Sequence, residues 1–177
     1  MSPAETATFR LWTPSGFQDD PWIHAETDDD LATGKPVIVP VNLLVALSPH
    51  QREAAGGRLG VQLSPADKLE TIAAELDRLA LVALAFPAFN DGRSFSKAEL
   101  LRSRYGFAGT VRATGQILVD QLPHMLRLGF NEFEVSDPVL IRRLTEGRIG
   151  GLPLYYQPSV KTAAAGQRFS WRRRPAA

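Results

Sequence analysis

The chain has 177 residues, 44% of them hydrophobic, which is enough for one domain with a substantial core. It contains no cysteine, so disulfides, thiolate nucleophiles, cysteine-ligated zinc and iron–sulfur clusters are excluded. The net charge of +1 excludes a uniformly basic surface, and no apolar run is long enough to span a membrane. Since no apolar stretch follows Met1, no signal peptide is expected, and we predict a soluble cytoplasmic protein.

Charge is concentrated at the two ends of the chain. Residues 1–36 hold seven acids and two bases, and residues 158–177 hold five bases and no acid. We predict an irregular N-terminal arm over 1–36, with a short strand at Phe9–Trp12, and a basic tail over 158–177. The ends are either solvated, paired with each other within a chain or across a dimer, or in contact with RNA or acidic lipid through the tail. The tail has few arginines for binding phosphates, so nucleic acid is not an expected partner.

Strand and helix signals alternate from Val37 onward. Ser-Pro pairs predict helix starts at Ser48 and Ser64, and a capping box predicts another at Ser96. Pro123 predicts a kink or a restart in a later helix. The six predicted strands are Val37–Val41, Leu59–Leu63, Leu81–Phe86, Thr110–Ala113, Asn131–Val135 and Leu152–Tyr156.

The spacing of these strands predicts the fold class. Strand centres are about 22 residues apart, with one longer step, which is typical of βα units. A closed eight-unit barrel typically needs about 200 residues or more. We therefore predict an α/β domain over 37–157, with repeated βα units in a mainly parallel sheet that is open or incomplete and barrel-like. A leucine-rich solenoid is less favoured because its motif does not recur. The edges of such a sheet need cover, so a homodimer is also predicted.

The long loop after the third predicted strand is the most informative candidate site. It contains Asp91, Gly92 and Arg93 and leads to the predicted helix start at Ser96. Free backbone N–H groups at a helix start bind oxyanions such as phosphate, sulfate or sulfite, and Arg93 would add a forked contact. The alternative is that Asp91 and Arg93 only join the loop to its neighbours.

Arg112 is a second candidate because a charged residue in a buried strand needs a partner. We predict Asp120 or Asp91 as that partner, or else an anion cradle made by Arg93 and Arg112. Asp120 and His124 are four residues apart on a predicted helix, but no nucleophile accompanies them and the catalytic residues are unknown. No spacing matches a metal site or a nucleotide-binding fingerprint, so neither a metal nor a cofactor is predicted.

A set of short motifs extends over Phe86–Val135, with a looser match from Val37. The motif residues are Phe86-Pro87, Phe89, Asp91-Gly92-Arg93, Phe95-Ser96, Leu100-Leu101-Arg102, Arg112-Ala113, Gly115, Asp120-Gln121-Leu122, Gly129-Phe130 and Phe133-Glu134. Together they resemble an uncharacterised bacterial family, a domain of unknown function. Genes of that family commonly lie beside assimilatory sulfite reductase, and its members are often labelled oxidoreductases.

The resemblance implies a role in sulfite reduction, with sulfite reductase or another sulfur-assimilation protein as partner. A chain without cysteine cannot ligate a sirohaem–iron–sulfur pair, and no nicotinamide or flavin fingerprint is present. We therefore expect an accessory protein without a redox centre of its own. The alternative is a small α/β enzyme or binding protein for an anionic metabolite, anchored by Arg93 and a helix N-terminus.

Overall fold

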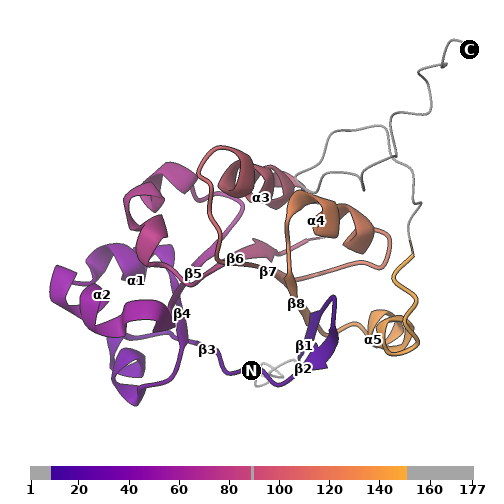
Figure 1. Cartoon of the computed structure of the whole chain (residues 1–177), viewed down its shortest axis with the longest axis horizontal. Helices are drawn as coiled ribbons and strands as arrows, with labels where there is room; N and C mark the ends of the chain where they lie inside the picture. The colour runs from indigo at the N-terminus through magenta and orange to yellow at the C-terminus, as the bar shows by residue number, and fades with distance from the viewer. Residues whose placement is uncertain (1–8, 89, 151–177) are drawn as a thin grey trace, which may run out of the picture.

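The sheet is a curled half-barrel of eight strands in the order β2-β1-β8-β7-β6-β5-β4-β3 (Figure 1). The computed structural model describes residues 9–88 and 90–150. Neighbouring strands from β3 to β8 are parallel, whereas β1 runs antiparallel to both β8 and β2. The strands are β1 (Arg10–Thr13), β2 (Gly16–Gln18), β3 (Ile23–His24), β4 (Val37–Pro40), β5 (Leu59–Leu63), β6 (Leu81–Phe86), β7 (Thr110–Gly115) and β8 (Glu132–Val135).

The prediction of an α/β fold with an incomplete barrel-like sheet is confirmed, and the sheet is mixed because of β1 and β2. Figure 1 shows the helices on the outside of the curled sheet. The sixth predicted strand, Leu152–Tyr156, and the basic tail lie outside the described residues. The α-helices are α1 (Val41–Ala46), α2 (Pro49–Ala55), α3 (Arg93–Ser103), α4 (Leu122–Leu128) and α5 (Pro138–Thr145), and the 3₁₀ helices are η1 (Asp28–Thr33), η2 (Gly56–Arg58), η3 (Leu69–Thr71) and η4 (Ala73–Arg78).

Local signals predict some helix starts correctly and others not. Ser48 caps α2 through a capping box with Gln51, as predicted. The helix predicted after Ser64 is instead the pair of 3₁₀ helices η3 and η4. The carboxylate of Asp67 accepts the Ser64 N–H at 2.7 Å and fixes a turn where an α-helix would begin. Pro123 lies in the first turn of α4, so the helix starts there and is not kinked.

The capping box predicted at Ser96 is wrong, because α3 begins one turn earlier, at Arg93. Two contacts fix this first turn on the end of β6. The Ser94 hydroxyl donates to the Ala85 carbonyl at 2.7 Å, and the Phe95 ring lies 5.0 Å from the Phe86 ring. These tertiary contacts outweigh the local preference of the capping residues.

The N-terminal segment contributes more to the sheet than the sequence predicts. The strand predicted at Phe9–Trp12 is present as β1, and β2 and β3 also lie within residues 1–36. Because β2 and β3 are at opposite edges of the sheet, the chain from Asp19 to His24 runs across the open side of the half-barrel (Figure 1). We call residues 19–24 the crossing segment.

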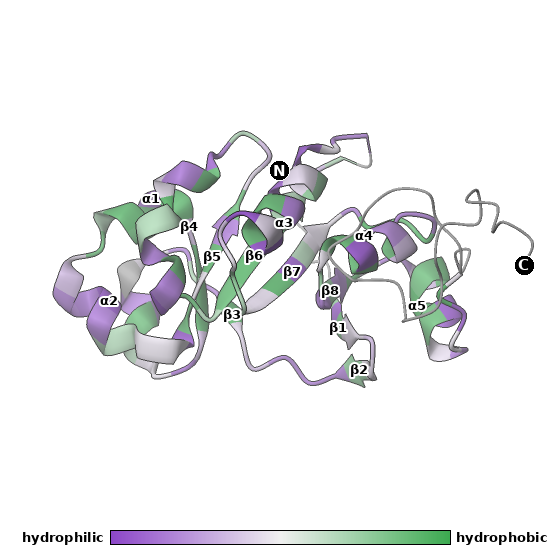
Figure 2. Cartoon of the chain, turned by 45° about the horizontal axis from the view of Figure 1, so that its top comes forward, coloured by the Kyte–Doolittle hydropathy of each residue, from purple (hydrophilic) through white to green (hydrophobic). Residues whose placement is uncertain are grey.

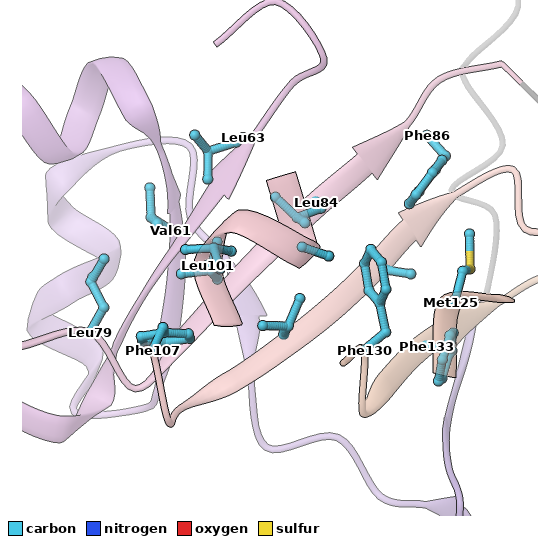
Figure 3. Close-up of a cluster of buried hydrophobic side chains, with 14 of the residues drawn as sticks. Val61, Leu63, Leu79, Leu84, Phe86, Leu101, Phe107, Met125, Phe130 and Phe133 are labelled. Atoms are coloured by element: carbon cyan, nitrogen blue, oxygen red, sulfur yellow. The ribbon is translucent and has the colours of Figure 1, made fainter. Parts of the chain in front are cut away.

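The main hydrophobic core lies between the outer face of the sheet and the helices. Residues that alternate along each strand, such as Val82, Leu84 and Phe86 on β6, point into it. Figure 2 shows β5 and β6 as mainly hydrophobic strands. Figure 3 shows Val61, Leu84 and Phe133 of the sheet with Leu101 of α3 and Met125 of α4. A smaller inner cluster contains Ile38, Leu81 and Ala83, with Trp22 of the crossing segment packed against it.

Candidate functional site

Arg112 lies at the centre of a charged cluster on the inner face of the sheet. Its neighbours Val111 and Ala113 belong to the outer core, so the alternation of β7 turns Arg112 inward. The side chain is fully buried, and all five of its N–H groups donate to carboxylates. The acceptors are Asp20 (2.7 and 3.0 Å), Glu132 (2.9 and 2.6 Å) and Glu134 (3.1 Å).

The three carboxylates keep Arg112 charged inside the protein. Burial alone would lower the pKa of Arg112, but the hydrogen bonds and charges of Asp20 and Glu132 outweigh it and raise the pKa. Glu132 is the register partner of Arg112 on β8, and Glu134 lies two residues further on the same face. A buried arginine paired in this way is stable only as long as its partners remain.

The same cluster ties the crossing segment to the far side of the sheet. His24 on β3 lies with its Nε2 atom 2.8 Å from the Glu134 carboxylate on β8. Trp22 packs over Gly60, where an added Cβ would lie 3.2 Å from the Trp22 ring. The cluster therefore joins the crossing segment and β3, at one edge of the sheet, to β7 and β8, with which β3 has no backbone pairing.

The partners predicted for Arg112 are wrong. Asp91 follows β6 and Asp120 follows β7, both beyond the ends of their strands, whereas Arg112 is in the middle of β7. The alternation of Glu132 and Glu134 with apolar residues on the fifth predicted strand, Asn131–Val135, was a signal for two of the true partners. Asp20 is 92 residues away in sequence, in a loop without a periodic pattern, so no local signal pointed to it.

The loop before α3 brings together Asp91, Gly92 and Arg93, as predicted. Arg93 donates from Nε and Nη2 to the Asp91 carboxylate at 2.9 and 2.7 Å, and its side chain is 63% exposed. This contact lowers the pKa of Asp91 to about 2. Gly92 is the N-cap residue of α3 and offers no side-chain cap, and Ser96 is exposed inside the helix.

The structure does not bring the remaining candidates to this loop. Arg112 shares no partner with Arg93, so the predicted anion cradle is not formed. Asp120 is exposed and makes no hydrogen bond or ion pair with any described residue. His124 packs instead against the Phe95 ring, with centroids 5.1 Å apart, and its pKa is lowered by burial and by the charge of Arg127.

Two further cations, the half-buried Arg102 and the buried Lys97, bind backbone carbonyls. Arg102 on α3 donates to the carbonyls of Phe107 (2.5 Å), Gly109 (2.8 Å) and Gly129 (2.9 Å), and burial lowers its pKa. Lys97 on the same helix donates to the carbonyls of Ser64 (3.0 Å) and Pro65 (2.8 Å), and burial lowers its pKa as well. Neither role is predictable from the sequence, because each depends on loops brought together by the fold.

Two kinds of feature are absent from the part of the chain that the structure describes. They contain no group of three or more histidine, aspartate or glutamate side chains placed to hold a metal ion. None of their helices is both long and apolar enough to cross a bilayer.

Comparison with known proteins identifies a family. The model of a family described as bacterial protein of unknown function, DUF934, matches residues 60–166. The match begins in β5 and includes β6 to β8 with the helices between them. No curated protein matches the chain.

Proposed function

The chain belongs to this DUF934 family of bacterial proteins, and with that as the starting point we propose that it is a cytoplasmic accessory protein of assimilatory sulfite reduction. In this proposal the chain has no redox centre and acts through contact with sulfite reductase or another sulfur-assimilation protein. The resemblance of Phe86–Val135 to a family whose genes commonly lie beside sulfite reductase supports the pathway. The lack of cysteine supports electron carriers that are held elsewhere.

One observation favours an accessory role: every N–H donor of Arg112 already has an acceptor within the chain. An oxyanion site needs donors that point at the ligand. All five donors of Arg112 are taken by carboxylates of the chain itself, and two further carboxylates would still surround the guanidinium if Asp20 were displaced. A sulfite ion entering that cluster would meet an excess of negative charge. The charged cluster on the inner face therefore suits stabilisation of the fold better than anion binding.

A second candidate function is the binding of an anionic metabolite at the N-terminus of α3. It is favoured by the exposure of Arg93, 63% of whose side chain is accessible, and by the position of Arg93 in the first turn of α3. The backbone N–H of Arg93 already donates to the Asp91 carboxylate at 3.3 Å. The bidentate contact with Asp91 weighs against it, because it neutralises the arginine.

Growth and binding experiments separate the two. We expect a deletion strain to grow normally on cysteine and poorly on sulfate or sulfite, and a gene carrying Arg93→Ala to restore growth. Tagged full-length protein should copurify with sulfite reductase. Normal growth on sulfate after deletion would contradict the accessory role. If sulfite or phosphate raises the Tm of the wild type and Arg93→Ala abolishes the shift, the second candidate is the better one.

A further inference from the structure

A hollow of about 460 Å³ lies at the open end of the β1–β2 hairpin. Its walls include Phe9 and Arg10 at the start of β1, Phe17 on β2, and Asp19 and Asp20 at the start of the crossing segment. Arg10 pairs in register with Val135, the last residue of β8, so the hollow opens at the carboxyl end of the parallel strands. Parallel α/β sheets place their ligands at this end.

Two opposite charges line the hollow without neutralising each other. Arg10 and Asp19 form no ion pair, either with one another or with another described residue. The Arg10 guanidinium lies over the Phe17 ring, 4.0 Å from its centroid, which fixes its position and leaves its N–H edges accessible. One cation and one anion are therefore available to a ligand in the same hollow.

Asp20 lines the hollow, but its charge is already paired and is not available to a ligand. Both of its oxygens accept from the buried Arg112, at 2.7 and 3.0 Å, and its side chain is 14% exposed. The balance of accessible charge is then one positive group, Arg10, against one negative group, Asp19. The rings of Phe9 and Phe17 are the aromatic part of the lining.

From this arrangement we propose that the hollow binds a small zwitterion of the α-amino acid class. The ligand carboxylate pairs with the guanidinium of Arg10, its ammonium group pairs with the carboxylate of Asp19, and its side chain lies against the two phenylalanine rings. A ligand with a single charge would leave either Arg10 or Asp19 without a partner while shielding it from water, so it binds more weakly. This inference does not depend on the role in sulfite reduction.

Calorimetry on the purified full-length chain tests the proposal, with each of the twenty standard L-amino acids as probe. We expect at least one to bind and to raise the Tm. The variants Arg10→Gln and Asp19→Asn should each weaken that binding roughly tenfold or more, as for loss of a charge-assisted contact. Two matched variants should bind as the wild type does: Arg104→Gln, an exposed arginine that lies over Tyr105 instead, and Asp77→Asn, an exposed aspartate on η4.

Analogues of the bound amino acid show whether the hollow recognises both its ammonium group and its carboxylate. The N-acetyl derivative of the bound amino acid lacks the ammonium group, so its weaker binding should be unaffected by Asp19→Asn and reduced by Arg10→Gln. The amide derivative lacks the carboxylate and should show the opposite pattern. Binding by none of the twenty amino acids would overturn the proposal. So would wild-type affinity in either Arg10→Gln or Asp19→Asn, because the site would then recognise at most one charge.

Discussion

Arg112 holds both carboxylate oxygens of Asp20, from a position 92 residues further along the chain. This contact attaches the crossing segment to the inner face of the sheet at the point where the half-barrel is open. In closed parallel barrels the strands complete a ring of backbone hydrogen bonds. Here charged side chains of the crossing segment, β7 and β8 bridge the open side of the half-barrel instead.

Replacement of Arg112 should destabilise the protein strongly. Arg112→Met leaves three carboxylates close together without their cation, and removing one partner of a buried ion pair typically costs about 3–5 kcal/mol. The free energy of unfolding in urea measures the effect. Arg104→Met, at an exposed position, should change that free energy by less than about 0.5 kcal/mol. An Arg112→Met protein with nearly wild-type stability would show that the cluster does not hold the sheet together.

Removal of Asp20 should loosen the crossing segment without unfolding the rest. Asp20→Asn keeps the shape of the side chain but loses the charge that Arg112 binds, while Glu132 and Glu134 still neutralise the arginine. We expect faster hydrogen exchange at the Ile23 and Ala25 amides, which donate to Pro36 and Ile38 in β3–β4 pairing. Exchange in β6 should stay as in the wild type. Unchanged protection at Ile23 and Ala25 would mean that backbone pairing alone anchors the segment.

Gly115 at the end of β7 should not tolerate a side chain. Its φ angle is +90°, and an added Cβ would clash with the Phe86 carbonyl oxygen on β6. Gly115→Ala is therefore expected to reduce the free energy of unfolding by about 2 kcal/mol or more. Gly57→Ala is the matched control, because a Cβ there meets nothing within 4 Å. Equal stability of the two variants would contradict the strained geometry at Gly115.

The ion pair before α3 makes a prediction about pH. Hydrogen bonding from Arg93 lowers the pKa of Asp91 from 3.8 to about 2. A carboxyl group with a lowered pKa stabilises the folded state above its unfolded pKa, and this contribution is lost as the pH falls towards 2. In Arg93→Ala the pKa of Asp91, followed by NMR, should rise towards 3.8. Arg78→Ala, a change at another exposed arginine, should leave it unchanged, and an unshifted pKa in Arg93→Ala would rule out this pair as the cause.

Local sequence patterns predict the strands β4 to β8, because apolar and β-branched runs between turn residues depend little on distant contacts. The incomplete barrel follows from strand number and chain length. The crossing segment could not be predicted in this way. β3 has two residues, and its position depends on Trp22 packing against the inner cluster and on the Asp20 contact with Arg112. Both are long-range interactions that leave no periodic signal in the sequence.

The candidate site was predicted in part for the same reason. Asp91, Gly92 and Arg93 are neighbours in sequence, so their clustering follows from the loop itself. The environment of Arg112 depends on register between β7 and β8 and on the crossing segment, and only Glu132 and Glu134 had a pattern that revealed their face. The oxyanion interpretation of the loop could not be weighed from sequence, since the bidentate Asp91–Arg93 contact depends on side-chain geometry.

The central claim is that Arg112 attaches the crossing segment to the sheet through Asp20. A double-mutant cycle between these two residues tests it most directly. Wild type, Arg112→Met, Asp20→Asn and the double variant are unfolded in urea, and the coupling free energy is taken from the four values. If Arg112 holds Asp20 in this way, the coupling free energy should be about 1.5 kcal/mol or more, in the range for buried partners in one network. A coupling near zero, with the two losses simply additive, would contradict it.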